Sequence, residues 1–119
     1  MVQRAITVGG SGSQTISIKP DTSRLLYNIQ SHNETWTATE DCVMVGSLKG
    51  SSGNATVFIG TTESNANVLI ESTGEIKIGS SDNYAQSNWG IFIPKDTVVH
   101  TKNSSGKTYN LYFYPVSTS

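Results

Sequence analysis

The chain has 119 residues and a formal net charge of −1, and only 14% of its residues are charged. It has no cluster of lysine and arginine residues that could neutralise the phosphates of a nucleic acid, so we expect no nucleic-acid partner. Its apolar runs never exceed about seven residues, far short of the roughly 20 that a membrane-spanning helix needs, so we expect no membrane insertion.

Hydrophobic residues make up only 35% of the chain. About a quarter of the residues are serine or threonine, which is far from average globular usage. The length fits one domain with little apolar surface to spare, so the core of a single copy is expected to be marginal.

The first 13 residues are expected to lie outside the main domain. Residues 2–8 predict a first strand, and the glycine and serine run over residues 9–13 predicts a linker or a stem junction. Residues 14–119 are then predicted to form a single β-sandwich domain.

Short segments with period-two alternation recur along this domain, separated by turns rich in Gly, Pro, Asn and Asp. No segment has a sustained helical period. The pattern predicts an all-β, antiparallel sandwich or barrel of about 8–10 strands. The expected strands are residues 14–19, 24–30, 35–39, 42–48, 55–59, 66–70, 75–78, 91–93, 98–100 and 111–114.

Four details of this pattern concern packing and strand pairing. Trp36 and Ala38 are expected to face inward. Residues 42–48 are apolar on both faces, which is typical of a central strand or of a strand whose second face is covered by another subunit. Residues 49–54 predict a hairpin loop. Residues 66–70 and 75–78 are expected to pair around the turn at residues 72–74.

The only cysteine, Cys42, excludes an intrachain disulfide. We interpret it as a small buried residue. The alternative is a catalytic thiolate, which would need His32 or His100 nearby as a base. No cysteine-hydrolase signature surrounds Cys42, and no serine stands in a G-x-S-x-G context. We therefore expect no enzyme activity. Asp82 with Asn83, or Asp96 with its neighbours, could offer oxygen ligands to Ca²⁺, but no loop has the alternating ligand spacing, and the two histidines are far apart in the sequence, so we expect no metal and no cofactor.

The last quarter of the chain has the densest aromatic content. Leu111 and Phe113 alternate there with Tyr112 and Tyr114, so both faces of the last strand carry large, mainly apolar side chains. The core of a single domain can bury only one of these faces, and a subunit contact would bury the other. We predict that Phe92, Tyr112 and Tyr114 line a subunit interface. The alternative is ordinary lateral packing, or solvent-facing tyrosines on an antiparallel sheet.

A sugar site is the second functional possibility. Sugar rings stack on aromatic side chains, while amide and carboxylate groups pair with sugar hydroxyls. The loop at residues 81–89 combines both kinds of side chain, although it is also compatible with a structural loop. The candidate glycan residues are Asp82, Asn83, Tyr84, Gln86, Asn88 and Trp89.

Three stretches carry a family resemblance: WTATEDCVMVGSL at residues 36–48, GIFIPKDTVVHT at residues 90–101 and YNLYFYP at residues 109–115. They resemble small jelly-roll heads of bacteriophage fibre and receptor-binding proteins, which are similar to the trimeric heads of tumour necrosis factor and complement C1q. The resemblance covers residues 14–115 as a pattern of strands and corners. Such sequences commonly place a glycine between the lysine and the aspartate of one corner, where this chain joins Lys95 directly to Asp96.

The resemblance implies a jelly-roll sandwich that forms a homotrimer in a virion. Its partners would be a host cell-surface glycan or protein, or another virion protein. The expected function is therefore a non-enzymatic attachment or structural module of a phage fibre or spike. The alternative is a carbohydrate-binding module of a bacterial surface or secreted protein, with an extracellular location.

Overall fold

The computed structural model describes residues 5–8, 14–17, 19–79 and 90–117. In these ranges the chain forms twelve β-strands and one short 3₁₀ helix, Asn65–Asn67. All strand pairs are antiparallel. No helix in the described ranges is long and apolar enough to cross a membrane. The all-β fold expected from the alternation is confirmed.

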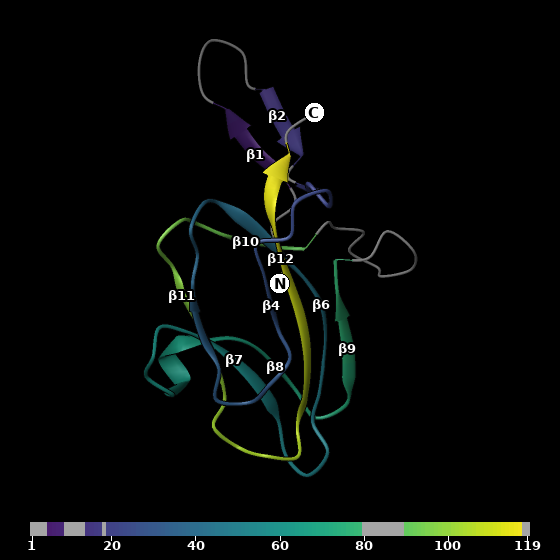
Figure 1. Cartoon of the computed structure of the whole chain (residues 1–119), viewed down its shortest axis with the longest axis vertical. Helices are drawn as coiled ribbons and strands as arrows, with labels where there is room; N and C mark the ends of the chain where they lie inside the picture. The colour runs from purple at the N-terminus through teal and green to yellow at the C-terminus, as the bar shows by residue number, and fades with distance from the viewer. Residues whose placement is uncertain (1–4, 9–13, 18, 80–89, 118–119) are drawn as a thin grey trace.

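Two sheets pack face to face (Figure 1). The first is built on the pairing of β6 (Cys42–Lys49) with β12 (Thr108–Ser117). Beyond β12 lie β3 (Lys19–Pro20) and β4 (Tyr27–Ile29), and beyond β6 lie β9 (Glu75–Ile78) and β10 (Ile91–Ile93). The second sheet has the order β5 (Thr35–Thr37), β11 (Val98–Thr101), β7 (Ala55–Ile59) and β8 (Val68–Ser72).

The strand order is that of a jelly roll. Both β9 and β10 pair with β6, β9 with residues 46–49 and β10 with residues 42–44, so together they form one interrupted edge strand. Counted this way, the strands from β4 to β12 number eight. The first, third, sixth and eighth lie in one sheet and the second, fourth, fifth and seventh in the other. The predicted jelly-roll sandwich is therefore confirmed.

The core lies between the sheets and is supplied by alternate residues of β4, β6, β7, β9, β10 and β12, with further residues from β5, β8 and β11. Leu111 and Phe113 of β12 are fully buried, as the alternation predicts. Trp36 is half-buried and packs between Tyr27, whose ring is stacked on it at a centroid distance of 5.3 Å, and Phe113, whose ring is tilted by 44° at 4.7 Å. This stack fills the side of the core where β4 and β5 form the ends of the two sheets.

Two expected strand pairings are wrong. The loop at residues 49–54 does not close a hairpin, because β6 and β7 belong to different sheets. Likewise β8 pairs with β7, and β9 pairs with β6. Alternation predicts the strands themselves, but it carries no information on whether a turn stays in one sheet or crosses to the other.

The N-terminal part of the chain forms a separate hairpin of β1 (Ala5–Val8) and β2 (Gln14–Ser17). Its two strands pair only with each other, and it projects from one end of the sandwich (Figure 1). Residues 14–17 were expected to begin the sandwich. In the structure, the first strand of the main sheets is β3, which pairs with Val116 and Ser117 at the end of β12.

The corner between β10 and β11 is built without glycine. Asp96 adopts a φ of 74°, in the left-handed region that Asp and Asn tolerate better than most residues. Its backbone N–H donates to the Ala38 carbonyl at 2.8 Å, and the Thr97 N–H donates back to the Pro94 carbonyl at 3.1 Å. The corner thus uses the left-handed conformation at Asp96 itself.

Gly46 allows β6 and β12 to approach each other closely. Its φ is +130°, and a Cβ at this position would lie only 2.0 Å from the Asn110 carbonyl oxygen. We expect Gly46→Ala to lower the free energy of unfolding by about 2 to 5 kcal/mol, since backbone strain costs about 1–3 kcal/mol and overpacking a similar amount. Urea unfolding followed by tryptophan fluorescence measures this change.

Gly74→Ala is the matched control. No atom lies within 4 Å of a Cβ built at Gly74, so its stability should change by less than about 0.5 kcal/mol. Equal destabilisation by both substitutions would contradict the close approach at Gly46.

Candidate functional site on the outer face of the first sheet

The three predicted interface residues lie on one surface. Phe92 of β10 is opposite Val43 of β6, and Val43 is opposite Tyr114 of β12. One step along the sheet, Val45 is opposite Tyr112. Directly opposed residues point to the same side of a sheet, and this side is the one that faces away from the core. We call these five residues the aromatic face.

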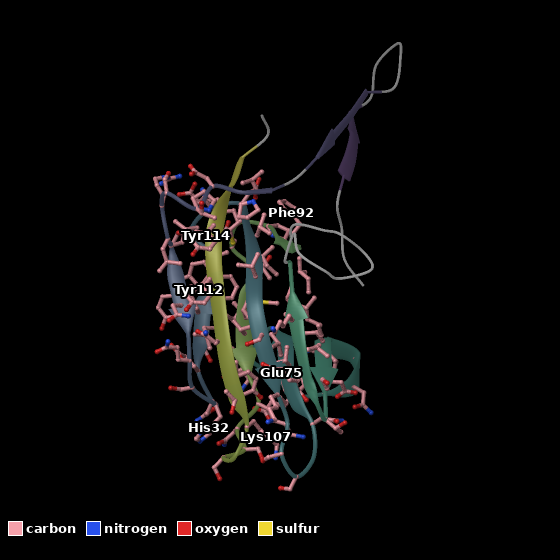
Figure 2. The ribbon with its side chains drawn as sticks, turned by 90° about the vertical axis from the view of Figure 1, so that its right-hand side faces the viewer. His32, Glu75, Phe92, Lys107, Tyr112 and Tyr114 are labelled. Carbon is pink, nitrogen blue, oxygen red and sulfur yellow. The ribbon has the colours of Figure 1, made fainter. Side chains whose placement is uncertain are left out.

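The aromatic face runs across three neighbouring strands. Figure 2 shows Tyr112 and Tyr114 in succession along β12 and Phe92 on the far side of β6. The two tyrosine rings are nearly parallel, with an interplanar angle of 8° and a centroid distance of 6.3 Å. Val43 is buried, while Phe92, Tyr112 and Tyr114 are half-buried in the single chain. The face therefore presents rigid aromatic surface next to a closed aliphatic centre.

Polar amides border the aromatic face on the β4 side. Asn28 lies opposite Tyr112, and its Nδ2 donates to the Leu111 carbonyl at 2.8 Å and to Asn110 Oδ1 at 3.3 Å. These bonds fix the Asn28 side chain, so the rim of the face is ordered. An apolar centre with an ordered polar rim is the arrangement found at protein interfaces.

The sequence predicted the aromatic members of this face and missed its centre. Val43 and Val45 lie in a segment that is apolar on both sides, so alternation alone does not separate the core residues from the outer ones. Asn28 was missed because its place beside Tyr112 depends on the register of β4 and β12. The six candidate glycan residues, Asp82, Asn83, Tyr84, Gln86, Asn88 and Trp89, lie outside the described residues.

A second group of polar side chains lies on the outer face of the second sheet. His100 is 7% exposed, and its Nε2 donates to Glu63 Oε2 at 2.6 Å, while its Nδ1 is 2.8 Å from Thr35 Oγ1. Both ring nitrogens are therefore occupied. From the sequence, His100 was considered as a base for Cys42 and, with His32, as a metal ligand. Its contacts with Thr35 and Glu63 were missed, because nothing in the sequence links positions 35, 63 and 100.

Cys42 is completely buried and faces the core. Its Sγ contacts the Ile93 carbonyl oxygen at 3.5 Å. Burial, with smaller contributions from the charges of Asp41 and Glu40, raises the pKa of the Cys42 thiol from 9.0 to about 12. The interpretation of Cys42 as a small buried residue is confirmed.

The other residues that the sequence offered for a catalytic or metal site do not come together. His32 is exposed in the turn between β4 and β5, on a different segment from His100. Among the described residues, no group of three or more His, Cys, Asp or Glu side chains is placed to hold a metal ion.

No protein-family model, curated protein or solved structure matches this chain. The aromatic face and the group around His100 are therefore interpreted from their own geometry.

The raised pKa of Cys42 predicts an unreactive thiol. At pH 8 the native protein should react with a thiol-specific disulfide reagent about 1,000-fold more slowly than the urea-unfolded chain, since that is the loss of thiolate when the pKa rises from 9.0 to about 12. Absorbance of the released reagent measures both rates. Similar rates in the two states would contradict the buried position of Cys42.

Proposed function

We propose that this chain is a non-enzymatic attachment or structural module of a bacteriophage virion, a fibre or spike head that works as a homotrimer and binds a host surface or another virion protein. The observation that carries this proposal is the aromatic face. Three aromatic side chains and two valines gather on the side of the first sheet that the core does not use.

Covering this face by other copies is energetically reasonable. Each of these partly exposed aromatic side chains has about 15 to 90 Å² of surface left to bury, which corresponds to about 0.4 to 2 kcal/mol at 25 cal/mol per Å². Three such residues in every copy add a substantial term to a domain whose stability is typically only about 5 to 15 kcal/mol. The low hydrophobic content of the chain makes this contribution more important.

The position of the aromatic residues suits a three-fold axis. Tyr112 and Tyr114 lie two strands away from Phe92, a separation of roughly 10 Å at the usual strand spacing. The face thus has a tyrosine half and a phenylalanine half. In a ring of three copies, the tyrosine half of one copy would meet the phenylalanine half of the next, which is a heterologous contact that closes on itself.

The phage assignment comes from the resemblance of residues 14–115 to fibre heads, and the jelly-roll strand order is compatible with it. A surface rich in serine and threonine suits an exposed particle appendage, because short hydroxyl side chains bind water at small entropic cost. A virion location and a glycan or protein receptor are parts of the same proposal.

The carbohydrate-binding module remains the second proposal. It requires an exposed aromatic side chain on a monomer, and Trp36 does not meet this requirement because it stacks between Tyr27 and Phe113. A glycan array separates the two proposals when it is combined with the oligomeric state. A monomer that binds a glycan would favour the module, whereas a trimer favours the fibre head.

The test of the proposed function is the oligomeric state at micromolar concentration. Light scattering should give the mass of three chains for the natural sequence, and one chain for the double variant Tyr112→Ser, Tyr114→Ser, because that variant removes the tyrosine half of the contact. Circular dichroism should show that the variant keeps its β-structure.

Leu25→Ser is the matched control. Leu25 is 50% exposed and lies outside the aromatic face, so this variant should remain trimeric. A natural chain that is monomeric at these concentrations, or a double variant that is still trimeric, would contradict the proposed use of the aromatic face.

A further inference from the structure

The outer face of the second sheet is covered in a different way from that of the first. Phe58 of β7 and His100 of β11 lie directly opposite each other on this outer side, with ring centroids 6.2 Å apart. Phe58 is only 5% exposed and His100 only 7%. Residues that point away from the core reach such burial when neighbouring side chains of the sheet or another segment cover them. The segment that contacts His100 is the loop between β7 and β8, which contains Glu63.

One carboxylate fastens this loop to the sheet. Glu63 Oε2 accepts a hydrogen bond from His100 Nε2 at 2.6 Å and another from the Asn103 backbone N–H at 2.8 Å. It thereby joins the loop to β11 and to the turn after β11. The neighbouring loop residues Thr61 and Thr62 are exposed. Where the loop begins, Gly60 is held by a backbone hydrogen bond to Val98 at 2.7 Å.

The histidine keeps hydrogen-bond partners in either protonation state. Its Nδ1 lies 2.8 Å from Thr35 Oγ1, and a hydroxyl group can either donate or accept a hydrogen bond. When Nδ1 is unprotonated the threonine donates to it, and when Nδ1 is protonated the threonine accepts from it. The state of the contact therefore depends chiefly on whether Glu63 carries its negative charge.

We propose that Glu63 and His100 form an acid-released latch, which holds the loop at residues 60–67 against β11 and lets it open when the Glu63 carboxylate is protonated. The opened state would expose a second aromatic surface, Phe58 with Val98 and His100, on the sheet opposite the aromatic face. This inference is independent of the proposed trimer, because the two surfaces belong to different sheets.

The charges around Glu63 decide whether acid or base weakens its contact with His100. Burial by itself raises the pKa of Glu63, but the hydrogen bonds from His100 and Asn103 and the positive charges of His100 and Lys102 lower it below its usual value of 4.5. The charge of Glu63 also helps, after burial, to raise the pKa of Tyr109 of β12. A carboxyl group with a lowered pKa adds stability that is fully present above pH 4.5 and is lost as the pH falls through its folded-state pKa. The latch is thus closed at neutral pH and opens in acid.

Hydrogen exchange resolved by mass spectrometry tests the latch on the full chain, with exchange rates corrected for the intrinsic effect of pH. At pH 7 the loop peptides should be protected in the natural chain. In Glu63→Gln, which imitates the protonated acid, their protection should already be about tenfold lower, the size expected when charge-assisted hydrogen bonds are lost. Acidification to about pH 3.5 should lower protection in the natural chain and change it little in the variant.

Glu40→Gln is the matched control, since Glu40 forms an exposed ion pair with Arg24 at 3.0 Å and lies outside the loop. It should leave loop protection unchanged. Fluorescence of Trp36, which is packed in the core stack, shows whether the sandwich stays folded in acid. Loop protection that is identical in the natural chain and Glu63→Gln at pH 7, or that falls only together with global unfolding in acid, would overturn the latch.

Discussion

The structure depends on the long antiparallel pairing of β6 with β12, which lie at the centre of the first sheet. Because side chains alternate along a strand, this register places Leu111 and Phe113 in the core and forces Tyr112 and Tyr114 onto the opposite side. A slip by one residue would exchange these pairs and break the core. The outward tyrosines are therefore a fixed consequence of the register that buries Phe113, and their surroundings must be explained together with the core.

Both outer faces of the sandwich carry aromatic side chains, and these are buried to different extents in the single chain. On the second sheet, Phe58 and His100 are already buried in the single chain, and Glu63 of the loop between β7 and β8 bonds to His100. On the first sheet, Phe92, Tyr112 and Tyr114 are half-buried in the single chain, and we propose that other copies complete their burial. A chain with only 35% hydrophobic residues gains much from either kind of burial, since a small domain has few other sources of stability. The charged latch also makes one of these faces sensitive to acid.

Local alternation was enough to predict most of the strands and the two faces of β12, because core and outer residues alternate one by one along segments such as Leu111, Tyr112 and Phe113. It was not enough for the topology. The turns after β6 and β8 cross between the sheets, and that choice depends on packing between distant strands. The group of Thr35, Glu63 and His100 was invisible for the same reason, as strand pairing and a loop bring together three positions that are far apart in the sequence. The φ of 74° at Asp96 could not be predicted either, because the sequence alone does not show which residue of a corner takes the left-handed conformation.

The most direct test of the central claim is the solvent exposure of Tyr112 and Tyr114 as a function of protein concentration, measured by hydroxyl-radical footprinting. If copies of the chain complete the fold, both tyrosines should be oxidised in dilute solution and protected at high concentration, while Leu25, which is 50% exposed, should be oxidised equally in both. Equal oxidation of the two tyrosines at every concentration would contradict the claim.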